Sequence, residues 1–226
     1  MSTLVFLLSL LALGSGAPGV KEVVESLKVD NGLSRGKWGS VDLCPSGSYA
    51  FAFEIKFETA GHVDETAMNG IKMYCKDVTG TLTGYTISSE GVEGEWQGLR
   101  SCNKGEYLQS LRGNVMPEQG TLHDDLGMYN FQMNCSDGQT LDGLHDTYHP
   151  PAQEKNEIKR EILTVDGREM EAIFLTTKIT ADDGVWSSWA SCTGYNRICG
   201  HQSRVQTNSI ADDAGLCDVI MFCCSF

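Results

Sequence analysis

Apolar and polar side chains alternate most clearly in one stretch near the start of the chain. Residues 51–58 place an apolar side chain at every second position, namely Phe51, Phe53, Ile55 and Phe57, with Ala52, Glu54, Lys56 and Glu58 between them. A period of two is that of a strand with one face in the core. Shorter apolar segments end at Cys75, Cys135 and Cys223, and a helical period is found only at residues 154–162. With 25 Gly residues and many turn signals, the pattern predicts an all-β protein.

A frame of four landmarks occurs three times along the chain. Each copy has a Trp, a Cys six positions later, an acidic pair, and a second Cys eleven positions after the first acid. The copies are Trp38, Cys44, Asp64-Glu65 and Cys75; Trp96, Cys102, Asp124-Asp125 and Cys135; and Trp186, Cys192, Asp212-Asp213 and Cys223. Such self-similarity predicts one supersecondary unit repeated three times, at about residues 36–80, 94–145 and 184–226.

The third copy is preceded by an insertion. The frame tryptophans are 58 and then 90 residues apart, which places about 32 extra residues at roughly 146–183. Within the insertion, Asp166-Gly167 separates two strand-like segments, 162–165 and 172–177, and predicts a hairpin. We expect one domain over residues 18–226, with the insertion as an added arm.

The first 17 residues have the pattern of a signal peptide. They carry no charged side chain, and the apolar run 4–13 is too short to span a bilayer. Small residues at Ser15 and Ala17 predict cleavage after Ala17, with Gly16 as the alternative. No later stretch approaches the roughly 18 apolar residues of a membrane span. The sequence therefore predicts a secreted, extracellular protein without a membrane span.

Nine cysteines fit an oxidising compartment, where disulfides persist. The frame itself supplies three pairs: Cys44 with Cys75, Cys102 with Cys135, and Cys192 with Cys223 or Cys224. Each would close a loop of about 30 residues and stabilise the fold by roughly 3–4 kcal/mol. Adjacent cysteines rarely bond each other, so we expect the doublet to reach both Cys192 and Cys199. Cys217 is then left over, as a buried thiol or an intermolecular link.

Net charge and motif content exclude several classes of function. The net charge of −13 argues against nucleic acid as a partner and leaves basic proteins, cations or neutral sugars. His145 and His149 precede Pro150-Pro151 without a helical pattern, so we predict a solvated loop and no metal site. The chain has no phosphate-binding loop and no nucleophile elbow, and we assign no catalytic residue and no cofactor. Asn134-Cys135-Ser136 is a glycosylation sequon, but the predicted disulfide next to it argues against occupancy.

The acidic pairs have two interpretations. A threefold fold would gather Asp64, Glu65, Asp124, Asp125, Asp212 and Asp213 as symmetry mates, which could bind a ligand or divide the acid and nucleophile roles on a glycosidic bond. Alternatively, an Asp before Thr66-Ala67-Met68-Asn69 is typical of a loop that caps backbone amides. The structural interpretation is the stronger one, because turn acids usually serve structure.

Several motifs of the frame resemble the vitelline membrane outer layer protein 1 family. The match rests on residues 38–39, 44–49 and 64–71 in the first copy, on 135–138 in the second, and on 186–189 and 198–200 in the third, and it covers residues 29–224. The insertion departs from the family pattern, as do Tyr129 and Cys217 at positions where the family has Asn. The resemblance implies a β-prism of the first kind, with three Greek-key four-stranded sheets around a pseudo-threefold axis. It also implies secretion, a structural role in an egg coat, and a carboxylate-lined cavity with proposed activity toward N-acetylglucosamine oligomers.

These observations predict a secreted structural protein of an egg coat, a mucosal layer or a secreted fluid. The expected partners are extracellular-matrix or egg-coat proteins, or glycans such as N-acetylglucosamine oligomers. Two alternatives remain, a carbohydrate-binding protein of the lectin type and a weak chito-oligosaccharide transferase or hydrolase.

Overall fold

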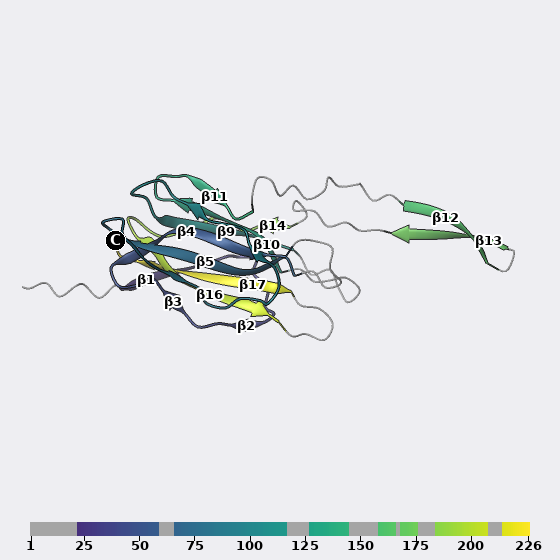
Figure 1. The fold of residues 1–226 in the computed structure, drawn as a ribbon, viewed down its shortest axis with the longest axis horizontal. Helices are drawn as coiled ribbons and strands as arrows, with labels where there is room; N and C mark the ends of the chain where they lie inside the picture. The colour runs from purple at the N-terminus through teal and green to yellow at the C-terminus, as the bar shows by residue number, and fades with distance from the viewer. Residues whose placement is uncertain are drawn as a thin grey trace, which may run out of the picture.

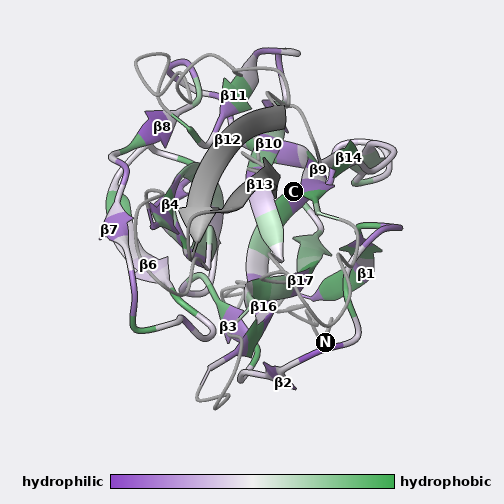
Figure 2. Cartoon of the chain, turned by 90° about the vertical axis from the view of Figure 1, so that its right-hand side faces the viewer, coloured by the Kyte–Doolittle hydropathy of each residue, from purple (hydrophilic) through white to green (hydrophobic). Residues whose placement is uncertain are grey.

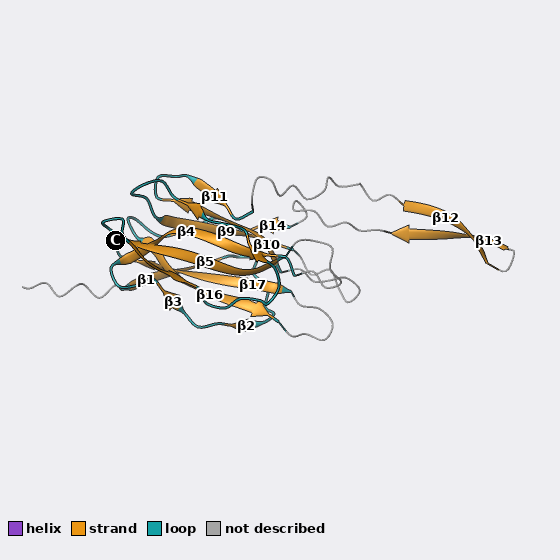
Figure 3. Cartoon of the chain, in the orientation of Figure 1, coloured by secondary structure: helices purple, strands orange, loops and turns teal. Residues whose placement is uncertain are grey.

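The computed structural model describes residues 22–58, 66–116, 127–144, 158–165, 168–175, 184–207 and 214–226. Within these ranges every regular element is a β-strand (Figure 3). No described segment is a helix long and apolar enough to cross a membrane. The all-β class that the sequence predicts is confirmed.

Three antiparallel sheets form the body of the protein (Figure 1). The first sheet has the order β6 (Leu82–Thr86), β5 (Met68–Asp77), β4 (Ser48–Phe57), with β7 (Glu95–Trp96) and β8 (Arg100–Ser101) on the far edge. The second has the order β11 (Thr140–Asp142), β10 (Met128–Cys135), β9 (Leu108–Val115), with β14 (Val185–Trp186) and β15 (Ala190–Ser191). The third has the order β1 (Val23–Lys28), β17 (Gly215–Cys224), β16 (Arg197–Gln206), with β2 (Lys37–Trp38) and β3 (Asp42–Leu43).

The three sheets have the same plan. The two short strands on each far edge act as one interrupted strand, so every sheet has four strand positions. In Figure 2 the sheets surround a common centre. This arrangement is the β-prism that the resemblance implies, with three four-stranded sheets about a pseudo-threefold axis.

The frames of the sequence do not coincide with the sheets. The frame tryptophans lie on edge strands: Trp38 pairs with Arg204 in the third sheet, and Trp96 pairs with Lys56 in the first. Trp186 likewise pairs with the second sheet. Each frame therefore begins on one sheet and ends on the next. The N-terminal strands β1, β2 and β3 complete the third sheet and close the ring.

Four disulfides are present. Three of them join neighbouring sheets, because the first cysteine of each frame follows an edge strand of the preceding sheet. They are Cys44–Cys75 between the third and first sheets, Cys102–Cys135 between the first and second, and Cys192–Cys223 between the second and third. The fourth, Cys199–Cys224, links β16 to β17. The open choice for Cys192 is thus settled in favour of Cys223.

The core fills the space that the sheets enclose. Phe53, Ile55 and Phe57 of β4 are at most 2% exposed, as their alternation predicts. Phe53 packs edge-on against Phe131 of the second sheet, with ring centroids 6.0 Å apart. Phe51 departs from the expected pattern, because the register of β4 against β5 shifts between Ala50 and Ala52. Its side chain instead joins a separate apolar cluster, with Tyr49, Tyr107, Cys199, Phe222 and Cys224.

The insertion contains a hairpin. Strands β12 (Ile158–Val165) and β13 (Arg168–Leu175) pair antiparallel, and residues 166–167 connect Val165 to its partner Arg168. The predicted hairpin is confirmed, although its strands begin and end at slightly different residues than expected. The helical period at 154–162 was misleading, because Ile158 and the residues after it form a strand. The hairpin forms a two-stranded sheet of its own and pairs with none of the described strands of the three main sheets.

Several predictions fall on residues outside the described ranges. These are the signal peptide at residues 1–17, the residues His145 and His149, and all three acidic pairs.

Candidate functional site

The six acidic candidates lie outside the described part of the chain, but the residues that anchor them are described. Asp64, Glu65, Asp124, Asp125, Asp212 and Asp213 belong to segments 59–65, 117–126 and 208–213. Each segment connects the two central strands of a sheet, β4 to β5, β9 to β10, or β16 to β17. The flanking residues are Glu58 and Thr66, Met116 and Gly127, and Thr207 and Ala214.

These anchoring residues meet at one end of the prism. The amide of Gly127 donates a hydrogen bond to the carbonyl of Ala214 at 3.0 Å, which joins the second sheet to the third. A Cβ added to Gly215 would lie 2.5 Å from the carbonyl oxygens of Thr66 and Met68 in the first sheet. The backbone of the third sheet therefore touches the backbones of both other sheets. We call this contact the axial junction, defined by Thr66, Met68, Gly127, Ala214 and Gly215.

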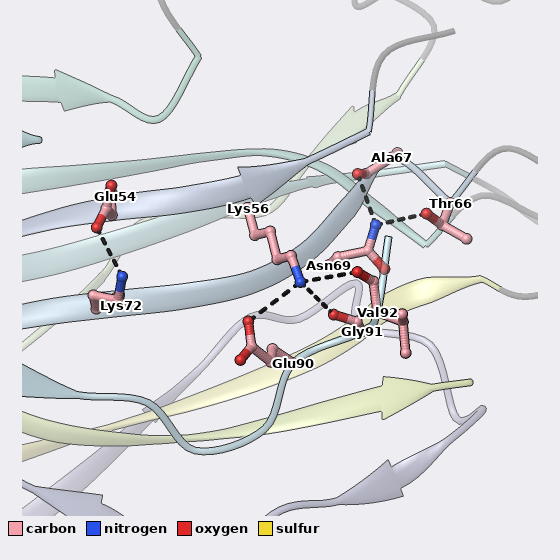
Figure 4. Close-up of polar contacts among 9 residues, drawn as sticks. All are labelled: Glu54, Lys56, Thr66, Ala67, Asn69, Lys72, Glu90, Gly91 and Val92. Atoms are coloured by element: carbon pink, nitrogen blue, oxygen red, sulfur yellow. Dashed lines mark hydrogen bonds and ion pairs between the residues drawn. The ribbon is translucent and has the colours of Figure 1, made fainter. Parts of the chain in front are cut away.

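A buried carboxylate holds the first of these loop ends in place. The Glu58 carboxylate accepts hydrogen bonds from the amide of Thr66 at 3.1 Å and from its hydroxyl at 2.6 Å. The Asn69 side-chain amide donates to the Thr66 hydroxyl at 2.6 Å and to the carbonyl of Ala67 at 3.4 Å (Figure 4). The capping group in the described chain is thus Glu58, which the sequence analysis assigned only to the polar face of a strand.

The positions equivalent to Asn69 carry different side chains in the other two sheets. Tyr129 packs edge-on against Phe57, with ring centroids 5.3 Å apart. Cys217 is a buried free thiol whose Sγ lies 3.6 Å from the carbonyl of Gly215, and burial raises the pKa of this thiol to about 11. A thiol in this environment is a weak nucleophile. Neither side chain carries the amide with which Asn69 holds Thr66, so this part of the capping arrangement belongs to the first sheet.

The frame tryptophans each lie beside a cation. Lys72 Nζ is 3.9 Å from the ring centroid of Trp96, and the Arg204 guanidinium is 5.8 Å from that of Trp38. Arg112 contacts both Trp186 and Trp189, at 4.5 and 4.8 Å. The frame tryptophans lie on edge strands, remain partly exposed, and make cation–π contacts.

Lys72 also belongs to a small polar network on β4 and β5. The Glu54 carboxylate accepts from Lys72 Nζ at 3.1 Å and from the Tyr74 hydroxyl at 2.6 Å. Burial and the Glu54 carboxylate together raise the pKa of Tyr74 to about 12. The network places a paired charge under an aromatic surface that includes Tyr85, which is 61% exposed.

A cleft of about 840 Å³ adjoins the axial junction end of the third sheet. It is lined by Arg35, Gly36, Lys37, Trp38 and Gly39, by Val205, Gln206 and Thr207, and by Ser89 and Glu90 from the connection between β6 and β7. The cleft could not be predicted from the sequence, because its lining comes from three segments far apart in the chain.

Two other candidate sites contain ordinary structural groups. Glu25, Cys192 and Cys223 lie within 4.8 Å of one another, but the two cysteines form a disulfide and offer no thiolate to a metal. The Glu25 carboxylate accepts hydrogen bonds from the amide and hydroxyl of Thr193. Asn134 is partly exposed on β10 and accepts a hydrogen bond from Thr140, so glycosylation of this sequon stays a prediction.

Comparisons with known proteins identify one family, two curated relatives and a solved structure with similarity to this chain. A family model described as vitelline membrane outer layer protein I (VOMI) matches residues 25–161 and 156–226. The vitelline membrane outer layer protein 1 homolog of Homo sapiens is 28% identical over 215 residues, covering 92% of this chain and 86% of that protein. The homolog of Mus musculus is 26% identical over 201 residues, covering 87% and 82%. Among solved structures, frutapin, a lectin from Artocarpus incisa, superposes with a TM-score of 0.48 at 10% identity, over 92% of this chain and 99% of that chain.

The family match extends over the whole three-sheet body. Its matched ranges include all three frames and the disulfide cysteines. Family and disulfides are both consistent with an extracellular protein. The chain belongs to the vitelline membrane outer layer protein I family.

Proposed function

We propose that this chain is a secreted, non-enzymatic structural protein of an extracellular layer, such as an egg coat, a mucosal layer or a secreted fluid. The observation that supports it most is the ring of inter-sheet disulfides. Each of the three sheets is bonded covalently to both of its neighbours through Cys44–Cys75, Cys102–Cys135 and Cys192–Cys223.

Such a ring suits a protein that must persist outside the cell. Each bridge closes a loop of 31 or 33 residues and stabilises the folded state by roughly 3–4 kcal/mol in the chain-entropy model. Because the bridges lie between sheets, no sheet can separate from the prism while the chain is oxidised. The net charge of −13 keeps the protein hydrated. The names of its relatives refer to the outer layer of a vitelline membrane.

A second candidate function is carbohydrate binding, favoured by the axial junction. The acidic pairs Asp64-Glu65, Asp124-Asp125 and Asp212-Asp213 lie in segments whose anchors meet at this junction. In this candidate function the six acids bind a neutral oligosaccharide such as an N-acetylglucosamine oligomer.

Retention in an extracellular layer tests the proposed function. Purified mature protein is added to isolated egg-coat or mucin layers, washed, and measured in the pellet and in the supernatant. We expect the oxidised protein to be retained and the reduced, alkylated protein to wash out. Recovery of the oxidised protein in the supernatant would contradict a structural role.

An assay for turnover of a sugar oligomer distinguishes the structural and carbohydrate-binding functions from an enzymatic one. The same protein is incubated with an N-acetylglucosamine hexamer, and the products are followed by mass spectrometry. The structural function predicts an unchanged hexamer, and carbohydrate binding predicts saturable binding without products. Hydrolysis or transfer that disappears in Asp64→Asn would establish catalysis instead.

A further inference from the structure

The third frame is the only one with a second tryptophan. Residues 186–189 read Trp186-Ser187-Ser188-Trp189, whereas the third residue after Trp38 is Val41 and the third after Trp96 is Leu99. The chain has four tryptophans in total, so the spacing Trp-x-x-Trp occurs once. The repeat explains the first tryptophan of this motif, and it does not explain the second.

Both tryptophans of this motif contact the same cation. The Arg112 guanidinium is 4.5 Å from the ring centroid of Trp186 and 4.8 Å from that of Trp189. Arg112 is held in turn by Gln132, whose Oε1 accepts from Nε at 2.8 Å and from Nη2 at 2.6 Å. The two indoles are therefore arranged around a fixed group, and the motif is ordered in the folded protein.

Ser187, between the two tryptophans, binds strand β9, and both rings stay outside the core. The Ser187 amide donates to the carbonyl of Gly113 at 2.8 Å, and the Ser187 hydroxyl accepts from the amide of Gly113 at 3.0 Å. Ser187 is buried, whereas Trp186 is partly exposed and Trp189 is 37% exposed. Neither tryptophan belongs to the core cluster of buried residues. A bulky polar group attached to one of these rings therefore does not have to enter the core.

An indole ring offers a nucleophilic carbon to an activated sugar. In C-mannosylation, C2 of the indole attacks C1 of the mannose in dolichyl phosphate mannose. A C–C bond forms, the C–O bond to the phosphate breaks, and dolichyl phosphate leaves with the bonding electrons. The proton of C2 passes to a base of the transferase, which restores the aromatic ring without an oxidant or a reductant. Transferases of this kind act in the lumen of the endoplasmic reticulum and modify the first tryptophan of Trp-x-x-Trp, the spacing found at 186–189.

We propose that Trp186 carries a mannose on C2 of its indole, attached while the chain passes through the secretory pathway. Trp186 is the first tryptophan of the single Trp-x-x-Trp sequence, and its ring lies outside the core. Trp38 and Trp96 lack the second tryptophan and stay unmodified. The proposal rests on the proposed secretion of the chain, because the sugar donor and the transferase act in the secretory pathway.

Mass spectrometry of the secreted protein tests the proposal. The full chain is expressed in vertebrate cells that C-mannosylate a co-expressed reporter with the same Trp-x-x-Trp spacing, and it is recovered from the medium. We expect the tryptic peptide 179–197 to carry the added mass of one hexose on Trp186, and the peptides with Trp38 and Trp96 to carry none. A C–C bond survives fragmentation, so the sugar ring breaks before the whole hexose is lost, which excludes an O-linked sugar on a serine. Trp186 without a hexose in this secreted protein would overturn the proposal, whatever Trp189 carries.

Two substitutions separate the motif from the contact with the cation. Trp189→Ala removes the second tryptophan of the motif, so Trp186 should lose its hexose. Arg112→Gln removes the cation and keeps the motif, so Trp186 should keep its hexose, because the transferase acts on the chain before it folds. The peptide is measured in the cell lysate as well as in the medium, so a variant that stays in the cell still gives a result. A hexose that persists in Trp189→Ala, or that is lost in Arg112→Gln, would contradict the motif as its cause.

Failure of secretion gives a different result from failure of this proposal. A wild-type chain that is missing from the medium would contradict the proposed extracellular function and the modification together. A wild-type chain that is recovered from the medium with an unmodified Trp186 would contradict the modification alone. Retention in an egg coat or mucin layer is measured separately, so the structural function does not depend on this result.

Discussion

Every frame tryptophan meets a cation, but different strand positions supply it. Lys72 comes from β5, and Arg112 and Arg204 come from the equivalent strands β9 and β16. Counted from the first cysteine of each frame, Arg112 corresponds to Gln202 and Arg204 corresponds to Asn114. The tryptophan therefore recurs in every frame, whereas the strand position of its cationic partner does not. A partly exposed indole on an edge strand favours a cation from whichever neighbour can reach it.

Replacing Lys72 should destabilise the protein, because Lys72 also pairs with the Glu54 carboxylate. In Lys72→Met the Glu54 carboxylate, whose side chain is 9% exposed, keeps only the Tyr74 hydroxyl. We expect the free energy of unfolding to fall by about 1–3 kcal/mol in urea denaturation, because a nearly buried charge loses its counter-ion. Lys104→Met, at an exposed position, should change it by less than about 0.5 kcal/mol. Equal stability of the two variants would show that the Glu54–Lys72 pair contributes nothing.

The burial of His201 should make the stability of the protein depend on pH. It is fully buried between the third and first sheets, where Nδ1 lies 3.1 Å from the Thr86 hydroxyl and Nε2 accepts from the amide of Ser88 at 3.4 Å. Asp42, its register partner on β3, instead accepts from the amide of Ile87. Burial lowers the pKa of His201 to about 4, so the native state holds the imidazole neutral.

The sign of the effect follows from proton uptake by the unfolded chain. Between its ordinary pKa of about 6.5 and about 4, His201 binds more protons unfolded than folded, so its contribution is present above pH 6.5 and is lost as the pH falls toward 4. The loss should amount to roughly 3 kcal/mol, and His201→Gln should remove it. Urea denaturation of both proteins from pH 7 to pH 4 measures the difference. Parallel curves would mean that His201 is not buried in neutral form.

At the scale of elements, the sequence predicts the strands better than their partners. Alternation identifies β4 because three of its side chains enter one core. It misplaces Phe51, since a register shift beside Ala50 depends on the partner strand and leaves no trace in the local pattern. The helical period at 154–162 fails for a related reason. Pairing with β13 outweighs a short periodic pattern in β12.

The frame predicts the disulfides but not the exchange of edge strands. Trp38 and Cys44 are close in sequence to β4, yet they lie on the edge of the third sheet. A repeated sequence does not indicate which sheet an edge strand joins, because the edges of all three sheets are equivalent. For the same reason the cleft could not be found. Its lining residues, from Arg35 to Gly39, Ser89 and Glu90, and from Val205 to Thr207, come together only when the edge strand β2 joins the third sheet.

Close approach at the axial junction gives a prediction about two glycines. Gly215 has a φ of 59°, and its Cβ would clash with the carbonyls of Thr66 and Met68, whereas Gly47 has a φ of 74° and nothing within 4 Å of its Cβ. Gly47→Ala should lower the free energy of unfolding by about 1–2 kcal/mol, because only the backbone conformation at this position is strained. Gly215→Ala should cost at least about 2 kcal/mol more, because the backbones of two sheets must separate. Thermal denaturation compares them, and equal costs would mean that the sheets do not touch at Gly215.

At the scale of the whole molecule, the prism is a closed ring. Strands β1, β2 and β3 of the N-terminal segment complete the sheet that the C-terminal strands β16 and β17 begin. Three disulfides then fasten every sheet to the next. Each sheet keeps its own two edge strands, so the ring is closed by packing and by covalent bonds between sheets. Strand pairing of the terminal segments and covalent bonds both oppose separation of the sheets, which is what the proposed role in an extracellular layer requires.

Peptide mapping without reduction tests the closed ring most directly. The full chain is expressed in secretory cells, recovered from the medium, and digested after alkylation of free thiols under unfolding conditions. We predict a mature N-terminus at residue 18, links Cys44–Cys75, Cys102–Cys135, Cys192–Cys223 and Cys199–Cys224, and alkylation of Cys217 alone. Free thiols at Cys44 and Cys75, or bridges confined within single sheets, would contradict the ring and with it the structural function.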